Sequence, residues 1–430
     1  MKNIYKLLTN TTKNQTAKDI VLMFIVTSGV NIINFIYHIV MGRVLGPSEY
    51  SVLALIISIF IISVTVISTF QMAAAKYSSI YFTENNDSKI RYLFLEITKG
   101  VLIATGVIFI LILIFIKRIQ FFLKIESITQ IILLAFMIII GAQLYIGRGI
   151  LQGVKKFGHL GFNQILENGL KLLIGILFVY LGFKSIGAIT GFLIALIVSF
   201  LFIFWPIRNI LRKNKMLNQN DVYDENKIGI KAFYRNILLM LAITVTFAII
   251  SYSDIILVKH FFPSTDAGYY SATIQIGKII LFFPMAVGLV VLPRLSEKIV
   301  KKEKLLGIML KGLLLITLLS SIILVLYYFF PQTIVKLIFG IQYLPAAELI
   351  FRYGLFMTLV SLINLEIYYF IATNRFIYLI ILIIILIEQL SIIFIFHNSL
   401  IIIIWILILN ALVMFFVGLS LIFYFEKKIL

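Results

Sequence analysis

The stretch that decides the fold is IVLMFIVTSGVNIINFIYHIVM, residues 20–41, followed by GRVLGPSEYS, residues 42–51. At about 1.5 Å of rise per residue, the first part is long enough to cross a bilayer as a helix. Four polar side chains interrupt it: Thr27, Asn31, Asn34 and His38. Their spacings of four, three and four residues place them on one helical face. Because such groups need partners in hydrocarbon, this face is expected to meet protein or a water-filled cavity.

The composition identifies the class of protein. The 430 residues are 62% hydrophobic and 13% charged, with a mean hydropathy of +1.10, whereas a soluble chain is about a quarter charged. The chain is therefore expected to be an all-α polytopic membrane protein. Its first apolar run exceeds a signal-peptide core and should be retained as a span. Cysteine is absent, which excludes disulfides and thiolate metal sites, and the net charge of +19 is assigned to loops beside the spans rather than to nucleic-acid binding.

The hydropathy pattern predicts twelve transmembrane helices. They are placed at residues 20–41, 51–75, 92–116, 128–147, 162–183, 185–205, 236–258, 270–292, 305–330, 346–371, 376–396 and 399–425. Most of the 37 lysines and arginines then fall in the loops on the side of the amino terminus. This asymmetry predicts that both termini are cytoplasmic and that the protein spans the cytoplasmic membrane many times.

The two halves of the chain resemble each other. The longest polar stretch, 208–235, reads as a cytoplasmic linker between six-helix bundles at 1–207 and 236–430. Matched residues at offsets of 216 to 221 are His38 and Asp254, Arg43 and Lys259, Pro47 and Pro263, and Glu167 and Glu388. Since each half has an even number of spans, a pseudo-two-fold axis along the membrane normal is expected, with the substrate path between the halves.

Intramembrane polar residues recur in spans seven and eight. Thr244, Ser251 and Asp254 share one face of span seven, and Gln275 and Lys278 share one face of span eight. An intramembrane charge is costly and usually functional, so Lys278 is expected to line a cavity. The alternative is an internal ion pair with Asp254 that only holds the two spans together.

Span five and the later spans hold further charges. Glu167 and Lys171 can pair within their helix and, with Arg148, are expected at the cytoplasmic mouth. Glu366 is expected at a solvated rim. Asp254 and Glu388 are candidates for sodium or proton coupling, because a poorly solvated carboxylate must be protonated, paired or bound to a cation. The competing interpretation is that Asp254 neutralises Lys278 or Lys259 and that Glu388 is protonated or paired with Gln389.

Other chemistry has little support in the sequence. A Gly-x4-Gly-Lys-Ser/Thr loop is missing, so the chain does not hydrolyse a nucleotide by that route. Four histidines without an HExxH pattern favour neither a structural nor a catalytic zinc site. No external loop is long enough to form a catalytic domain. The chain is therefore expected not to be an enzyme and to need no cofactor.

Two stretches resemble a known family. Residues 42–50, GRVLGPSEY, resemble the first external turn of the O-antigen-type polysaccharide and oligosaccharide flippases. Residues 148–153, RGILQG, followed by Phe157 and Glu167, agree with this family at the junction of spans four and five. Ser51 departs from the pattern, where a glycine or alanine commonly follows the tyrosine. The resemblance covers the whole chain and implies the multidrug/oligosaccharidyl-lipid/polysaccharide exporter superfamily.

The resemblance implies that the protein moves a lipid-linked sugar across the membrane by alternating access through a cationic cavity. A polyprenyl-diphosphate-linked sugar has an anionic head, which a fixed cation could bind. The expected substrate-binding residues are Lys278, Gln275, Arg43, Lys259, Asn31, Asn34 and His38. Expected partners are this substrate, membrane lipids, and a polysaccharide polymerase or glycosyltransferase.

Two other functions stay open. A cation-coupled multidrug antiporter of the same superfamily would use Asp254 or Glu388, although Lys278 disfavours its net acidic cavity. A non-transporting subunit of an envelope-assembly complex would gain nothing from polar stripes inside its spans.

Overall fold

The protein is a multi-pass helical membrane protein. The computed structural model describes residues 2–212, 230–281, 304–373, 375 and 377–427, and these contain helices and no strand. Among these residues, nine helical stretches are long and apolar enough to cross a membrane. Two of them, Val21–Thr83 and Phe157–Arg208, are long enough for two crossings each. The all-α fold class predicted from the composition is confirmed.

The chain divides into two compact units. Unit 1 contains residues 1–41 and 66–228, and unit 2 contains residues 42–65 and 229–430. The turn after the first span and the beginning of the second span therefore belong with the carboxy-terminal helices. The predicted linker, 208–235, is partly helical, because α6 continues to Arg212 and α8 begins at Ile230; the residues between lie outside the described ranges.

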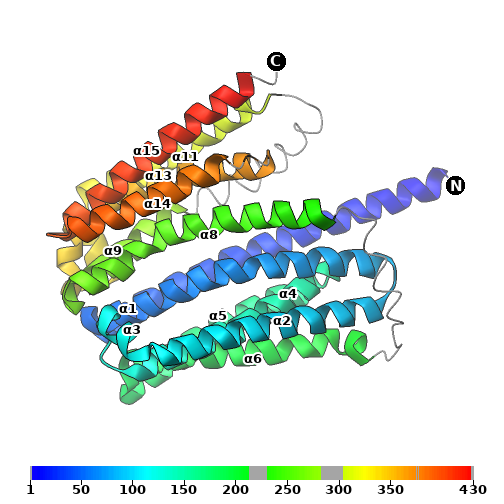
Figure 1. Cartoon of the computed structure of the whole chain (residues 1–430), viewed down its shortest axis with the longest axis horizontal. Helices are drawn as coiled ribbons and strands as arrows, with labels where there is room; N and C mark the ends of the chain where they lie inside the picture. Colours follow the sequence, from blue (N-terminus) through cyan, green and yellow to red (C-terminus); the bar gives the residue numbers. More distant parts are fainter. Residues whose placement is uncertain (1, 213–229, 282–303, 374, 376, 428–430) are drawn as a thin grey trace. The chain divides into compact units, whose positions relative to one another are not determined.

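Unit 1 is built around helices that run side by side (Figure 1). Its elements are parts of α1 (Lys2–Thr83), then α2 (Asp87–Ile114), α3 (Ile116–Leu123), α4 (Ile128–Gly153), α5 (Phe157–Phe178), the π-turn η1 (Val179–Phe183) and α6 (Lys184–Arg212). Helix α6 packs against both α4 and α5. Glycines permit the closest approach: a Cβ atom on Gly191 of α6 would lie 2.6 Å from the backbone nitrogen of Gly175 of α5. Close backbone contact of this kind is a common way for helices to associate in lipid.

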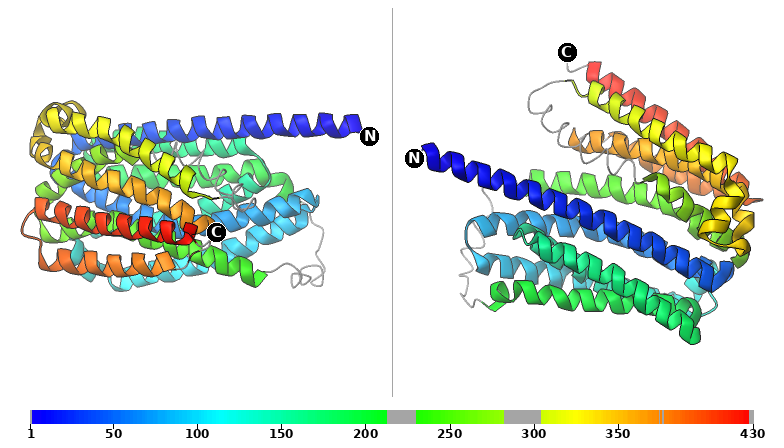
Figure 2. Two further views of the ribbon diagram at one scale, coloured as in Figure 1. Left: turned by 90° about the horizontal axis from the view of Figure 1, so that it is seen from above. Right: turned by 180° about the vertical axis from the view of Figure 1, so that it is seen from behind.

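Unit 2 is also built from helices that pack side by side (Figure 2). It contains α8 (Ile230–Phe261), α9 (Ser264–Gly277), the 3-10 turn η3 (Lys278–Leu281), α11 (Leu306–Phe329), α12 (Pro331–Ile338), η4 (Ile341–Ala346), α13 (Ala347–Ala372), α14 (Ile377–Ile395) and α15 (Leu400–Lys427). Helix α13 contacts α9, α11 and α15, and α14 packs on α8. The second part of predicted span eight lies outside the described residues.

The internal repeat is visible in the helix boundaries. Helix α13 begins and ends 219 residues after α4, and α15 begins 216 residues after α6. The short helices α3 and α12 also correspond, at an offset of 215. The order and lengths of the described helices thus follow the two-fold repetition predicted from matched residues.

Helix α1 is broken at one point, a few residues after the chain passes from unit 1 to unit 2. Gly46 has φ of +72°, which an L-residue with a side chain rarely adopts, and Pro47 follows it. Together they end the first span and start the second. This is the position of the polar turn predicted from the sequence.

Candidate functional site

Unit 1 encloses a charged network across α4, α5 and α6. The Nη2 atom of Arg148 lies 2.5 Å from Oε2 of Glu167, and both side chains are buried. The Nε atom of Arg148 donates to Oδ1 of Asn163 at 2.8 Å, and the Asn163 amide donates to the carbonyl of Ser199 at 2.7 Å. This buried ion pair and the hydrogen bonds beside it join the three helices.

Lys171 lies one helical turn beyond Glu167 but does not form the predicted pair within the helix. Its ammonium donates to Oδ1 of Asn34 on α1 and lies 4.8 Å from the ring centroids of both Tyr37 and Phe192. Glu167 instead pairs with Arg148, whose guanidinium presents several donors in a fork. The network therefore contains two cations and one carboxylate, and all three side chains are buried.

The polar stripe of the first span faces protein. Asn34 bonds to Lys171, and Asn31 is half-buried. His38 is buried, with its ring edge-to-face to that of Tyr37 at 5.6 Å. Asn34 therefore lies on the side of α1 that meets α5, and Thr27 is half-buried like Asn31.

In unit 2, Asp254 is enclosed by tyrosines. The hydroxyls of Tyr270 on α9 and Tyr353 on α13 each donate to Oδ2 at 3.0 Å. The amide of Ile255 donates to Oδ1 at 2.8 Å, and the side chain is buried. These three donors stabilise a carboxylate inside the unit without a cation in direct contact.

Lys278 marks the point where α9 passes into the 3-10 turn η3. It is half-buried, and its ammonium lies 4.6 Å from the ring centroid of Tyr252. It interacts electrostatically with Asp254, but no ion pair within 4.0 Å joins them in the described part of the chain. The Gln275 side chain, one turn earlier, is also half-buried. The internal ion pair considered from the sequence is therefore absent as a direct contact.

Lys259 and Arg43, predicted near an outer rim, both have structural partners. Lys259 is fully buried and donates to the hydroxyls of Ser51 at 2.9 Å and Ser264 at 2.6 Å. Arg43 is exposed, but its guanidinium donates to the carbonyls of Leu337 and Ile338 at the end of α12. Lys259 is thus enclosed rather than open to a substrate, because α8 and the turn at 42–51 close around its ammonium.

The turn at 42–51 is held by hydrogen bonds and packing against the segment after α12. Tyr343 donates to the carbonyl of Gly42 and Gln342 donates to that of Arg43, both at 2.9 Å. A Cβ atom on Gly42 would lie 2.5 Å from the ring of Phe339. The residues that resemble the flippase turn therefore fasten two parts of unit 2 together. No pattern in the sequence indicated that Phe339, Gln342 and Tyr343 would contact this turn.

The two predicted coupling carboxylates lie in different surroundings. Glu388 is exposed on α14, whereas its neighbour Gln389 is buried and donates to the carbonyl of Ile250 at 3.0 Å. Gln389 therefore faces α8 and Glu388 faces outward, so the pairing of these two neighbours considered from the sequence is not formed. The hydroxyl of Ser251 on α8 is buried and has no hydrogen-bond partner among the described residues.

Two carboxylates that the sequence analysis did not predict to be buried are enclosed. Glu366, expected at a solvated rim, is fully buried and accepts a hydrogen bond from Tyr378 at 3.3 Å. Glu426 accepts from the backbone amides of Leu305 and Leu306, at 2.7 and 3.2 Å, and so caps the start of α11. From the sequence, a polar residue near the end of an apolar run is expected to contact water. The packing of the helices shows that these two side chains are instead buried.

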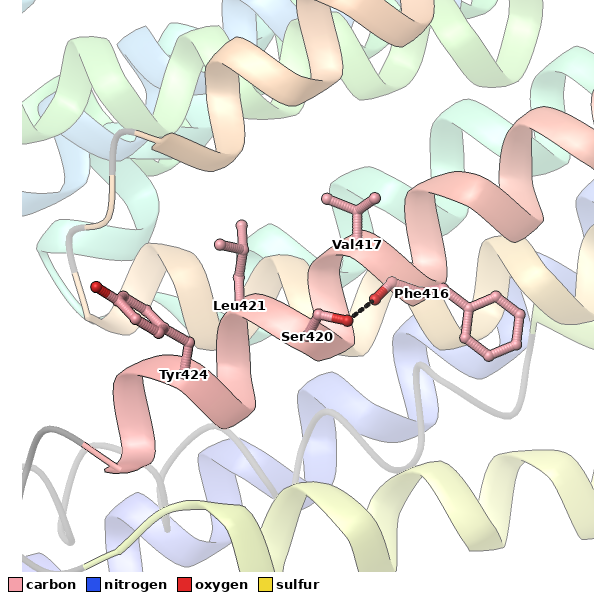
Figure 3. A pocket seen from close by; sticks show the side chains of 5 residues that line it. All are labelled: Phe416, Val417, Ser420, Leu421 and Tyr424. Atoms are coloured by element: carbon pink, nitrogen blue, oxygen red, sulfur yellow. Dashed lines mark hydrogen bonds between the residues drawn. The ribbon is translucent and has the colours of Figure 1, made fainter.

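The described residues offer no metal site and one mainly apolar depression on α15. They include no cluster of three or more histidine, aspartate or glutamate side chains that could hold a metal ion. Figure 3 shows a shallow depression on α15 lined by Phe416, Val417, Ser420, Leu421 and Tyr424. The Ser420 hydroxyl donates to the carbonyl of Phe416 at 2.7 Å, and no charged side chain lines the depression. It is not a candidate site for an anionic ligand.

Comparison with solved structures defines the fold. The chain is similar to a multidrug resistance MATE family transporter of the MOP superfamily in an inward-facing conformation, with a TM-score of 0.69 and 15% identity, covering 93% of this chain and 96% of that one. It is also similar to the lipid II flippase MurJ in an inward closed conformation, with a TM-score of 0.66 and 16% identity, covering 95% and 87% of the two chains. The fold is that of MATE and MurJ.

Comparison with family models defines the family. Residues 16–299 match the model described as polysaccharide biosynthesis protein. The chain belongs to this family, and the resemblance inferred from its two motifs is confirmed. The same fold is thus found in a multidrug transporter and in a lipid II flippase. No curated protein matches the sequence significantly.

Proposed function

We propose that the protein is a flippase that moves a polyprenyl-diphosphate-linked oligosaccharide across the cytoplasmic membrane by alternating access, for assembly of a cell-surface polysaccharide. Both termini are cytoplasmic in this proposal, as the loop charges predict. The polysaccharide biosynthesis family and the similarity to a lipid II flippase support a substrate of this class.

The observation that carries the proposal is one half-buried intramembrane lysine, Lys278 of unit 2. Its ammonium lies over the ring of Tyr252, and no carboxylate lies within ion-pair distance of it in the described residues. An aromatic ring stabilises a cation at modest strength, about 0.5–2 kcal/mol. An anionic head could therefore bind such a lysine without displacing a carboxylate.

Ion coupling forms a second part of the proposal. Asp254 is the stronger candidate for a proton or sodium ion, because it is buried and the unpartnered hydroxyl of Ser251 lies one turn away on the same helix. Glu388, exposed on α14, is the weaker one. Transport in proteoliposomes with the sodium and proton gradients collapsed separately tests this coupling. Transport that ignores both gradients would contradict it, and so would a gradient dependence that Asp254→Asn leaves intact.

The decisive experiment measures translocation of a labelled polyprenyl-diphosphate oligosaccharide in proteoliposomes. Lys278→Ala should reduce the rate at least tenfold, whereas Lys278→Arg should restore part of it because the positive charge returns. Lys311→Ala is the matched control, since Lys311 is an exposed lysine on α11 of the same unit. Gel filtration would show that each variant is folded.

The outcome separates the remaining functions. Normal transport by Lys278→Ala would refute the anion site. Export of cationic dyes without movement of the lipid-linked sugar would identify a multidrug antiporter instead. Binding of the lipid-linked sugar without translocation would indicate a non-transporting subunit.

A further inference from the structure

Helix α3 presents a cationic surface that the transport site does not use. Lys117, Arg118, Phe121 and Lys124 are all exposed, and we call them the α3 surface. Phe121 has 84% of its area exposed, the highest value among the large apolar side chains of the described residues. The opposite side of the same segment is anchored by the buried side chains of Leu123 and Ile125. The helix is therefore fixed to unit 1 on one side and open on the other.

The neighbouring turn extends this surface. Gln130, in the first turn of α4, donates to the hydroxyl of Ser185 at 2.7 Å, which ties the α3–α4 turn to the start of α6. Just before Ser185, the π-turn exposes Tyr180, Leu181 and Phe183. Exposed aromatic side chains beside cations are typical of the boundary between lipid tails and headgroups.

The position of α3 in the chain agrees with such a boundary. It follows the third apolar span, and with eight residues it is far too short to cross a bilayer. A short amphipathic helix with cations around an exposed aromatic residue lies in the plane of the interface. The segment from α3 to the start of α4 contains three cations and one carboxylate, Glu126, so its excess charge is positive.

The repeat supplies an internal comparison. Helix α12 occupies the equivalent place in unit 2, and an offset of 216 matches Phe121 with Leu337, which is 74% exposed. The same offset matches buried Leu123 with buried Phe339, and Lys124 with Gly340, both at positive φ. The scaffold is therefore shared, but α12 carries only Lys336 as a cation. Cationic character is specific to α3 and is not a requirement of the scaffold.

We propose that the α3 surface docks into the headgroup layer of a bilayer and binds anionic phospholipid. Phe121 enters the boundary of the acyl chains, and Lys117, Arg118 and Lys124 contact the phosphates around it. Under the topology predicted from the loops, α3 lies on the side of the membrane whose loops hold few cations. The preference of cytoplasmic loops for lysine and arginine therefore does not account for the cations of the α3 surface. Charge complementarity with an anionic lipid surface gives them a partner.

The test uses the absence of cysteine in the natural chain. Phe121→Cys is labelled with a fluorophore, and the protein is reconstituted in bilayers that contain spin-labelled phosphatidylglycerol or spin-labelled phosphatidylcholine at equal mole fraction. We expect the anionic lipid to quench at least about threefold more than the zwitterionic one. Adding Lys117→Gln, Arg118→Gln and Lys124→Gln should bring this ratio close to one.

Leu337→Cys on α12 is the matched control, because the same scaffold presents one cation there. Its preference for the anionic lipid should be clearly weaker than that of Phe121→Cys. Equal quenching by both lipids at position 121 would overturn the anionic preference. Quenching by aqueous acrylamide but by neither lipid would show that α3 stands in water, and it would overturn the docking itself.

Discussion

Removing the carboxylate of the unit 1 network should be far more damaging than removing its second cation. Arg148 and Glu167 form a pair whose side chains are 4% and 8% exposed, and Lys171 lies buried beside them. Glu167→Gln leaves two buried cations without a counter-charge. Breaking a buried pair in this way costs about 3–5 kcal/mol of unfolding free energy.

Lys171→Met should behave differently. The methionine keeps an apolar stem against Tyr37 and Phe192, and the remaining Arg148–Glu167 pair is electrically balanced. The lost contact with Asn34 and the lost cation–π contacts are offset by no longer burying an ammonium, so the net change should stay below about 2 kcal/mol.

The assay exploits the two tryptophans of the chain. Trp205 lies on α6 of unit 1 and Trp405 lies on α15 of unit 2. In a Trp405→Phe background, the fluorescence of Trp205 during a titration with denaturing detergent reports the unfolding of unit 1. The unfolding free energies of Glu167→Gln, Lys171→Met and the double variant are compared with that of the background protein.

The double variant provides the sharpest criterion. Removing Lys171 from the Glu167→Gln protein should recover about 1–2 kcal/mol, because it removes one of the two buried cations that the first change leaves without a counter-charge. The argument is refuted if Lys171→Met costs as much as Glu167→Gln. It is refuted equally if the double variant is less stable than the sum of the single changes predicts.

Three further predictions concern packing and caps in unit 2, and the changes in stability are measured by the fluorescence of Trp405 in a Trp205→Phe background. Glu426→Ala should cost about 2 kcal/mol, because it leaves backbone amides of the first turn of α11 without an acceptor; an unchanged unfolding midpoint would contradict this. Gly268→Ala should lower the folded yield in gel filtration, since its Cβ would overlap the backbone of Pro47, while Gly307→Ala, with open space around it, should not. Arg43→Lys should destabilise unit 2 by about 1 kcal/mol, because a single ammonium replaces the guanidinium that donates to two carbonyls at the end of α12. Equal stability of the variant would show that Arg43 does not cap this helix.

The turn at 42–51 was predicted correctly as a break between two spans, but the contacts of Arg43 within it and of Lys259 beside it were not. Its glycine and proline predicted a break between two spans, and the structure has that break at Gly46. Its resemblance to the flippase turn identified the family, which the match over residues 16–299 confirms. The assignment of Arg43 and Lys259 to a substrate rim had no such local basis. The partner Ile338 of Arg43 lies 295 residues away at the end of α12, and the partner Ser51 of Lys259 lies 208 residues away in the turn.

Local rules therefore determined much of this protein from its sequence alone. Hydrophobic runs of membrane length, separated by glycine, proline and charged residues, specify the helices. They form helices because a backbone in lipid must satisfy its own hydrogen bonds. The recurrence of matched residues at a nearly constant offset specified the repeat. Both signals are carried by neighbouring residues and by composition.

Only the tertiary structure decided which polar side chains are enclosed and with whom they pair. Glu167 had a cation one turn away in the sequence, yet it pairs with Arg148 from another helix. Glu388 and Gln389 are adjacent in the chain, yet the amide is buried and the carboxylate is exposed. Successive residues on a helix point about 100° apart, so the rotation of the helix against its neighbours sets each environment. That rotation depends on the packing of whole helices, which no local pattern encodes.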